Sequence, residues 1–304
     1  RAGRRVRGKA TPRAASAERR FTFEELLLIQ LHALKERSKF KRHKAPEIPA
    51  DIDAMKRFVA LLPFALTDAQ RKAIWEILTD IAKPIPMNRL LEGDVGSGKT
   101  IVAAAAAYMT ARAGYQTAVM APTEILANQH FATFEKILKP FDLSIGLMTG
   151  SQKHTPADHP CDVIVGTHAL IQKNVLFDKL GLIIVDEQHR FGVAQRAKLA
   201  AGNRKLENGR EVVPHFLSMT ATPIPRTLAL TVYGDLDLSL LDEAPKSRKK
   251  IITQIVKPGD RQKAYAFMKK EITAGGQAFI VCPKIDQDAN QTPQKLGQQQ
   301  IYQL

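Results

Sequence analysis

Residues 93–100 read Gly93-Asp94-Val95-Gly96-Ser97-Gly98-Lys99-Thr100, and this stretch decides the fold. The spacing is that of the P-loop, whose glycines let consecutive backbone N–H groups turn toward a phosphate while the lysine reaches the β- and γ-phosphates. The threonine hydroxyl is placed to hold Mg²⁺, and the following helix directs its positive end at the anion. An apolar strand must enter such a loop and a helix must leave it, and residues 89–91 and 101–107 meet both demands. We therefore predict a nucleotide site here.

Five short apolar stretches around this loop are predicted to be parallel strands. Amphipathic helices separate them, which is typical of a parallel α/β sheet covered by helices on both faces. The stretches are residues 89–92, 117–121, 162–166, 180–186 and 215–219. Ligands of open α/β sheets bind at the carboxyl ends of the strands. Since each stretch runs into small or polar residues, we expect the five ends to converge on one crevice.

The bulk composition bounds the class of protein. With 304 residues, 44% of them hydrophobic, the chain is long enough for one large domain and part of another. A net charge of +15, concentrated in the first 50 residues, favours a polyanionic partner over a neutral small molecule. The two cysteines indicate neither a disulfide framework nor a metal site. No apolar stretch reaches ~18 residues and no signal core follows the basic start, so we expect a cytoplasmic protein without a membrane partner.

Four segments are expected along the chain. Residues 1–20 are rich in Arg and Ala, lack apolar periodicity, and are predicted to be disordered. Residues 21–58 are predicted to form an amphipathic helix and a basic linker, residues 59–244 the main α/β domain, and residues 245–304 the start of a second domain. In that second domain we predict a strand at 251–256, a helix at 261–273 and a strand at 277–282.

The sequence Asp186-Glu187-Gln188-His189 follows an apolar strand, where a P-loop enzyme keeps its second acidic motif. We predict that Asp186, together with Thr100, binds Mg²⁺ and that Glu187 orients and deprotonates the attacking water. Adjacent carboxylates on a strand point to opposite faces, so the backbone must turn at Glu187 for both to serve one site.

Gln70 stands about one helix and one strand before the P-loop. Thr67 is suited to cap the helix that begins there, which places Gln70 in its first turn. A glutamine amide both donates and accepts hydrogen bonds, which matches the edge of adenine and mismatches guanine. We predict that Gln70, with the nearby Phe64, selects ATP.

These stretches together resemble motifs Q, I, Ia, Ib, II and III of superfamily 2 helicases, in order and in spacing. Within that superfamily, residues 186–193 and 219–230 look like those of the RecG family of ATP-dependent DNA helicases, as do residues 233–243 and 281–283. The resemblance implies RecA-like domains and a motor that uses ATP and Mg²⁺ to move on branched or duplex DNA. We also expect a monomer; a single-stranded-DNA-binding protein is compatible as a partner, but no residue here predicts one.

The resemblance further assigns residues to DNA and to coupling. It implies that Pro122, Thr123, Gly166, Thr167 and His168 touch phosphate oxygens of the tracked strand. Contacts of hydroxyl and N–H groups with phosphates position a strand without reading its sequence, as a motor requires. Residues Thr220, Ala221 and Thr222 would couple hydrolysis to DNA engagement, and Gln188 and His189 would lie between the nucleotide and the DNA.

Three departures from the family pattern bear on activity. The branch-reading wedge domain expected before Phe21 has no counterpart in residues 1–20, so we expect fork recognition to be weak or absent. The arginine-bearing motifs V and VI are not found, so we expect a truncated fragment that hydrolyses ATP poorly. Residues 150–162 are shorter than the family pattern. Two alternatives stay open: a transcription–repair coupling translocase, which usually has Glu in place of Gln188, and a nucleotide-dependent DNA-binding module with little hydrolysis.

Overall fold

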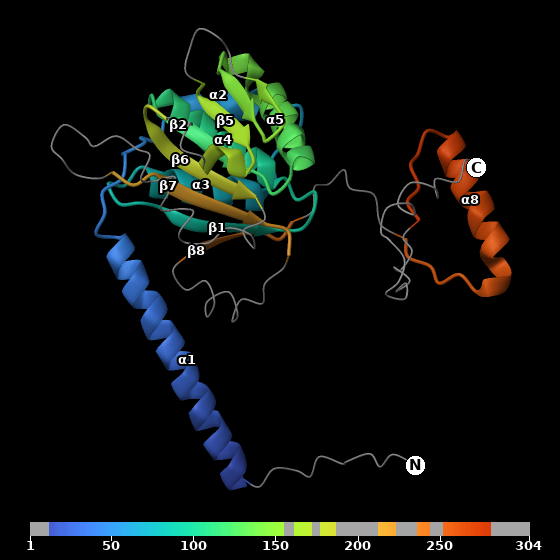
Figure 1. The fold of residues 1–304 in the computed structure, drawn as a ribbon, viewed down its shortest axis with the longest axis horizontal. Helices are drawn as coiled ribbons and strands as arrows, with labels where there is room; N and C mark the ends of the chain where they lie inside the picture. Colours follow the sequence, from blue (N-terminus) through green and yellow to red (C-terminus); the bar gives the residue numbers. More distant parts are fainter. Residues whose placement is uncertain are drawn as a thin grey trace, which may run out of the picture. The chain divides into compact units, whose positions relative to one another are not determined.

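The structure is a computed structural model that describes residues 12–154, 161–171, 177–186, 212–222, 236–243 and 252–280. The chain divides into two compact units, Arg1–Arg248 and Lys249–Leu304. Figure 1 shows the sheet of the first unit with helices packed against it. None of the described helices is both long enough and apolar enough to cross a bilayer.

A single eight-stranded sheet organises the described part of the first unit. The strand order is β4-β3-β5-β2-β6-β7-β1-β8, and every neighbouring pair is parallel except β3 and β4. The strands are β1 (Asn88–Gly93), β2 (Gln116–Met120), β3 (Ile145–Met148), β4 (Lys153–His154), β5 (Val163–Gly166), β6 (Leu180–Asp186), β7 (His215–Thr220) and β8 (Asp237–Leu241). All five predicted strands are therefore present. Strands β3, β4 and β8 were not predicted.

The described α-helices are α1 (Pro12–Phe40), α2 (Ile52–Ala60), α3 (Asp68–Ile81), α4 (Lys99–Arg112), α5 (Glu124–Leu138) and α8 (Arg261–Thr273). Helix α4, which leaves the P-loop, is the most deeply buried, because residues 101–110 are all enclosed. Its run of alanines from Ala103 to Ala107 lets the helix lie close to α3, α5 and β2. A close-packed helix in this position fixes the P-loop relative to the sheet.

Alternation along the central strands divides the apolar residues between two cores. On β2 and β6, Val119 and Ile184 belong to the larger core with α3, α4 and α5, whereas Met120 and Val185 belong to a second core on the opposite face. Successive side chains of a strand point to opposite faces. In a parallel sheet that is covered on both faces, ligands bind at the carboxyl ends of the strands.

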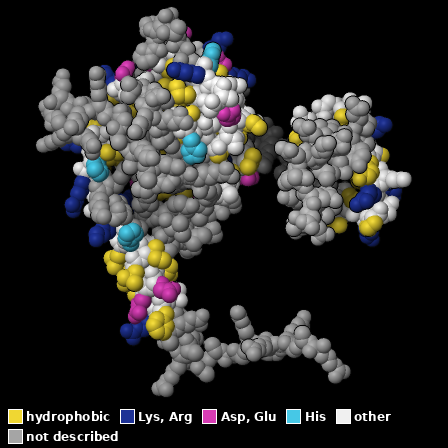
Figure 2. All heavy atoms as spheres, in the orientation of Figure 1, with side chains coloured by type: hydrophobic (Ala, Val, Ile, Leu, Met, Phe, Trp, Pro, Cys, Tyr) yellow, Lys and Arg dark blue, Asp and Glu magenta, His cyan; other side chains and the backbone are white. Residues whose placement is uncertain are grey.

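The N-terminal region differs from its expectation. Helix α1 begins at Pro12, so residues 12–20 are helical rather than disordered; proline is well tolerated in a first helical turn. The predicted apolar residues of this helix are exposed by 43–68% (Figure 2): Phe21, Phe23, Leu26, Leu27, Leu28, Ile29, Leu31 and Leu34. Near its end, the guanidinium of Arg37 pairs with the carboxylate of Asp237 on β8 at 2.6 Å.

The linker after α1 is docked onto the sheet by a buried histidine. The Nε2–H of His215 donates to the carbonyl of Pro46 at 2.7 Å, and its Nδ1 accepts from the backbone N–H of Met87 at 3.0 Å. Burial lowers the pKa of His215 from 6.5 to about 4, because a charged imidazolium would lose its hydration. The ring is therefore neutral at physiological pH and holds the linker against the start of β1.

The described part of the second unit contains α8, over the residues predicted to be helical, and the short 3₁₀ turn Pro258–Asp260. The strands predicted at 251–256 and 277–282 are absent over the described residues 252–256 and 277–280, so that prediction is wrong there. A strand persists when its backbone pairs with a neighbour and its side chains pack. Ile255 and Phe279 are instead exposed by 97% and 85%.

Candidate active site

The carboxyl ends of the predicted strands lie along one edge of the sheet. In the register, Leu91 of β1 lies opposite Met219 of β7, and Met219 lies opposite Asp186 of β6. On the far side of β6, Val185 lies opposite Met120 of β2, which in turn lies opposite Gly166 of β5. These strands end within about one residue of the same row, so their ends share one edge of the sheet as expected (Figure 1), and a crevice at that edge stays a prediction.

The P-loop connects β1 to α4 through two left-handed glycines. Gly96 and Gly98 have φ of 80° and 86°, a region that favours glycine. Gly98 also has no room for a side chain, since a Cβ there would collide with the amide nitrogen of Gln70. At Gly93 a Cβ would come within 2.5 Å of the Ser97 hydroxyl. The glycines thus permit both the turn and the close approach that a phosphate cradle needs.

Lys99, at the start of α4, folds back over the loop. Its ammonium donates to the carbonyl of Gly93 at 2.6 Å and to that of Asp94 at 3.1 Å. The Ser97 hydroxyl is buried and has no hydrogen-bond partner among the described residues. The Lys99 ammonium and the buried Ser97 hydroxyl are both suited to phosphate oxygens, which accept several hydrogen bonds at once. Asp94 and Val95 lie exposed on the outside of the loop.

Gln70 is joined directly to the P-loop. Thr67 and Gln70 form the predicted cap of α3: the Thr67 hydroxyl accepts from the backbone N–H of Gln70, and the Gln70 side chain accepts from the N–H of Thr67 at 3.0 Å. The amide nitrogen of Gln70 donates to the carbonyl of Ser97 at 2.8 Å. Gln70 is 4% exposed, whereas Phe64 is 46% exposed. The side chain therefore supports the loop, and its role toward adenine stays a prediction.

Asp186 ends β6 two strands away from β1. One of its carboxylate oxygens, Oδ2, lies 2.7 Å from Nε2 of His130 on α5, and both side chains are largely buried. Thr100 is half-buried in the first turn of α4. Three other predicted catalytic residues, Glu187, Gln188 and His189, lie outside the described residues.

The donor set at this edge fits Mg²⁺ bound together with a nucleotide. A hydroxyl and a carboxylate are hard oxygen ligands, which Mg²⁺ prefers, and this ion is usually held by one or two protein groups together with phosphates and water. Within the described ranges there is no cluster of three or more His, Cys, Asp or Glu. One hydroxyl and one carboxylate match the few protein ligands that Mg²⁺ takes beside phosphate, and binding of the ion stays a prediction.

The predicted DNA residues lie side by side at the ends of β2 and β5. The backbone N–H of Ala121 donates to the carbonyl of Gly166 at 2.8 Å, which joins the segment of Pro122 and Thr123 to that of Thr167 and His168. Thr123 caps α5 by accepting from the N–H of Leu126 at 3.3 Å. Gly166 is required by packing, because a Cβ there would collide with the carbonyl of Met148.

The predicted coupling residues continue β7 into this edge. Thr220 is opposite Glu92, the residue before the P-loop, and is 1% exposed. Its hydroxyl lies 2.9 Å from that of Thr222, with Ala221 between them. The segment 220–222 therefore starts beside the strand end that leads into the loop, and its coupling role stays a prediction.

Comparison with known proteins identifies the family to which this chain belongs. A family model described as DEAD/DEAH box helicase matches residues 67–231. The chain belongs to the DEAD/DEAH box helicase family. This membership and the parallel sheet confirm the expected RecA-like α/β fold.

Within that family the chain is similar to RecG proteins, which confirms the resemblance seen in the motifs. It is 46% identical over 277 residues to the ATP-dependent DNA helicase RecG of Aquifex aeolicus, covering 88% of this chain and 34% of the relative. It is likewise 46% identical over 281 residues to that of Bacillus subtilis, covering 89% and 40%. A solved structure of RecG bound to a three-way DNA junction matches with a TM-score of 0.74 and 41% identity, over 88% of this chain and 36% of that one. The chain thus spans well under half of these relatives.

One feature of this candidate site was missed from the sequence, namely His130. It lies 56 residues before Asp186, and only the packing of α5 against the sheet brings the two together. His130 follows Thr123 of the predicted motif Ia by two helical turns, and this spacing could have identified it as a residue near the site.

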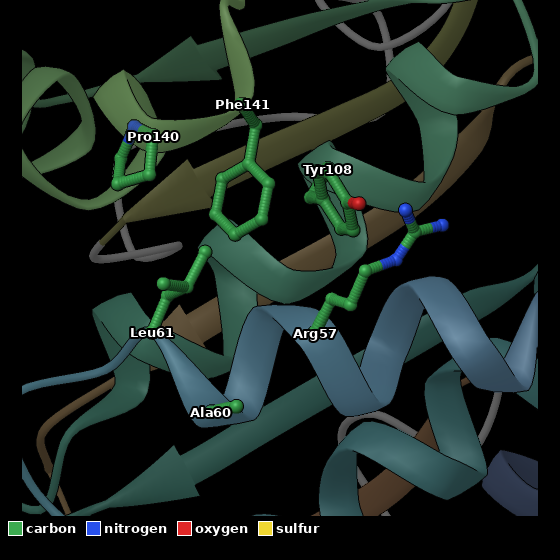
Figure 3. Close-up of a pocket in the computed structure, with 6 residues that line it drawn as sticks. All are labelled: Arg57, Ala60, Leu61, Tyr108, Pro140 and Phe141. Carbon is green, nitrogen blue, oxygen red and sulfur yellow. The ribbon is translucent and has the colours of Figure 1, made fainter.

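A pocket of about 410 Å³ lies away from this edge. It is lined by Arg57, Ala60, Leu61, Tyr108, Pro140 and Phe141 (Figure 3). Its aromatic wall consists of Tyr108 and Phe141, whose ring centroids are 4.4 Å apart. Tyr108 lies nine residues after Lys99 on α4, about 14 Å along the helix axis. The pocket contains none of the predicted site residues and reflects the packing of α2 against α4.

Proposed function

We propose that this chain is the ATP-binding part of the motor of an ATP-dependent DNA helicase that remodels branched DNA such as stalled forks and Holliday junctions. The observation that carries the proposal is the shared sheet edge, where the P-loop, Asp186 and the segments at 122–123 and 166–168 come together in a RecG-like chain. Residues 59–244 would be the first RecA-like domain and residues 245–304 the start of the second, with residues 21–58 as the connection to a preceding domain.

The nucleotide would be held mainly by the loop and by Lys99. The backbone N–H groups of residues 93–100 and the positive end of α4 would surround the phosphates, and the ammonium of Lys99 would exchange its loop carbonyls for the β- and γ-phosphate oxygens. Gln70 would fix the loop through the Ser97 carbonyl while contributing to recognition of adenine. A loop held in this way is organised before the nucleotide arrives, which lowers the cost of binding.

Thr100 and Asp186 would hold Mg²⁺ at the phosphates. Bound there, the ion neutralises charge that develops on the phosphoryl group during transfer. Glu187, the next residue after Asp186, would take the proton of the attacking water, with Gln188 and His189 toward the DNA side. In this motif Asp186 would therefore bind the metal and Glu187 would move the proton.

DNA would lie along the neighbouring strand ends. Pro122, Thr123, Gly166, Thr167 and His168 would contact phosphate oxygens, and such contacts are independent of base sequence. The net charge of +15 favours this partner. Thr220 and Thr222, between the P-loop and the DNA-facing strands, would transmit the state of the nucleotide. We further propose a cytoplasmic monomer, with a single-stranded-DNA-binding protein as a compatible partner.

Two other functions differ in what they predict. A transcription–repair coupling translocase would act on unbranched duplex, and Gln188 together with the RecG names of the similar proteins favours the first proposal over it. A nucleotide-dependent DNA-binding module would show binding of DNA that depends on ATP without turnover.

ATP turnover measured with a three-way junction, with a linear duplex of equal length and without DNA separates these functions. We expect nucleotide binding and low basal turnover by the chain. Because branch reading is expected to reside in a preceding wedge domain, greater stimulation by the junction than by the duplex is expected of a longer protein that carries both this chain and that domain. As a control, Glu187→Gln should retain nucleotide and lose about 10²- to 10⁴-fold in turnover. Equal stimulation of that longer protein by both DNAs would favour the translocase, and turnover that ignores DNA would contradict the proposal.

A further inference from the structure

His130 makes the closest described side-chain contact of the predicted metal-binding aspartate. Its Nε2 lies 2.7 Å from Oδ2 of Asp186, and the two side chains are exposed by only 11% and 14%. An ionised carboxylate only accepts hydrogen bonds, so the ring nitrogen Nε2 donates its N–H to Asp186. A hydrogen bond to a charged acceptor in a largely dry position is stronger than an average one.

The histidine is itself fixed by the helix that carries it. Helix α5 is capped at its start by Thr123 and buries Ala127, Phe134 and Leu138 in the main core, on either side of His130 in the sequence. The ring therefore has little freedom to follow Asp186 if the carboxylate rotates. The contact holds Oδ2 in place, so the other carboxylate oxygen keeps a defined direction.

We propose that His130 is a positioning residue that orients the Asp186 carboxylate toward the Mg²⁺ that accompanies the nucleotide. The inference rests on the proposed function of the site. Groups that hold a metal-binding side chain from behind typically contribute about 10- to 100-fold to metal affinity or activity. His130 acts on the metal through Asp186 and leaves the phosphate cradle of Lys99 and the loop unchanged.

A purely structural role makes a different prediction. If His130 only compensates for the burial of Asp186, its loss destabilises the fold and weakens nucleotide binding to the same extent with and without Mg²⁺. If it positions Asp186, the defect is confined to binding that requires Mg²⁺.

Binding of a fluorescent ATP analogue to the whole chain tests this difference. The analogue is titrated in EDTA, which reports on the cradle alone, and then at fixed concentration with increasing Mg²⁺. We expect His130→Ala to raise the Mg²⁺ concentration for half-maximal effect by about 10-fold or more, with affinity in EDTA within about twofold of the parent chain. His130→Gln, whose amide can still donate to Asp186, should recover much of the loss, and Gln129→Ala, an exposed neighbour on the same helix, should match the parent.

Three results would overturn the inference in a folded His130→Ala chain: an unchanged Mg²⁺ requirement, an equal loss of affinity in EDTA, or a further tenfold loss when His130→Ala is added to Asp186→Ala. The last follows because a residue that acts through Asp186 has nothing to orient once that carboxylate is removed. A parent chain that binds no analogue would overturn the proposed function itself, and this inference with it.

Discussion

At the start of β1 the guanidinium of Arg89 is enclosed by carboxylates, whereas at the end of the same strand the ammonium of Lys99 is held by backbone carbonyls. Arg89 is bonded to Asp80 at 2.6 Å, to Glu76 at 3.2 Å and to the hydroxyl of Ser239 at 2.8 Å. Lys99 bonds the carbonyls of Gly93 and Asp94, beside a Ser97 hydroxyl that is buried and unmet within the described residues.

The difference shows which end is built for structure and which for a ligand. In the Arg89 cluster a positively charged guanidinium faces negatively charged carboxylates, and the pKa of Asp80 shows the effect of this pairing. Burial alone would raise the pKa of Asp80, but hydrogen bonds and positive charge from Lys83 and Arg89 outweigh it and hold the pKa below its ordinary value. The two carbonyls that accept from Lys99 carry partial charge, whereas phosphate oxygens are ionised, so a phosphate offers this ammonium stronger hydrogen bonds than these carbonyls do.

Breaking the structural end should have the largest effect on stability. Arg89→Met leaves Asp80 and Glu76 without their main partner, and we expect the free energy of unfolding to fall by about 3 kcal/mol. The loss is at the lower end of the range for buried ion pairs because Asp80 keeps Lys83 at 2.6 Å. Urea denaturation measures it, and nucleotide affinity of the folded variant should stay within about twofold. A folded variant that loses nucleotide binding would contradict the separation of the two ends.

Breaking the functional end should have the opposite outcome. We expect Lys99→Ala to weaken nucleotide binding about 100-fold or more, because the charged contact to the phosphates is lost, and to change the free energy of unfolding by no more than about 1 kcal/mol. Titration of a fluorescent ATP analogue measures the first and urea denaturation the second. Lys72→Ala, at an exposed lysine of α3, is the matched control. A Lys99→Ala chain with normal affinity and turnover would refute the phosphate cradle.

Acid should act on the structural end through His215, beside Met87 at the start of β1. Burial lowers its pKa from 6.5 to about 4, so between these values the unfolded chain binds the proton and the folded chain does not. Stability from this group is thus complete above about pH 6.5 and is lost as the pH falls toward 4, by about 2 kcal/mol at pH 5. Denaturation at pH 7.5 and pH 5 measures the change.

His215→Gln sharpens that test. A glutamine can accept from Met87 and donate to Pro46 without titrating. The part of the pH dependence due to position 215 should therefore disappear in the variant. An identical fall in stability in both chains would show that other groups cause it.

The comparison also explains what the sequence could predict. The P-loop, its flanking strand and helix, and the cap that joins Thr67 to Gln70 are set by neighbours a few residues apart, and these predictions agree with the structure. The Arg89 cluster and the His130–Asp186 pair join residues 150 and 56 positions apart, which no local pattern specifies. Strands β3 and β4 are short, with four and two residues, so they show little alternation.

In the second unit the sequence predicted strands that the described residues do not form. The apolar runs at 251–256 and 277–282 have the composition of strands, yet Ile255 and Phe279 remain exposed and no strand forms over the described parts of either run. Strand propensity measures how well residues fit a pleated, half-buried surface. Where the described chain offers no such surface, composition overpredicts.

The smallest expected effect connects the two ends of the comparison through α3. The carboxylate of Glu243, just after β8, accepts from the backbone N–H of Asp68 at 3.1 Å and of Ala69 at 3.4 Å, at the start of the helix that carries Gln70. A negative charge at a helix N-terminus contributes about 0.3–1 kcal/mol. We expect Glu243→Gln to lower the free energy of unfolding by that amount, and high salt to reduce the difference between the two chains, because it screens an exposed charge. A loss of stability that is unaffected by salt would show that Glu243 acts through packing instead of its charge.

Glu243→Gln should also weaken nucleotide binding slightly, by less than about fivefold, because Gln70 lies in the same helix turn and bonds Ser97 of the P-loop.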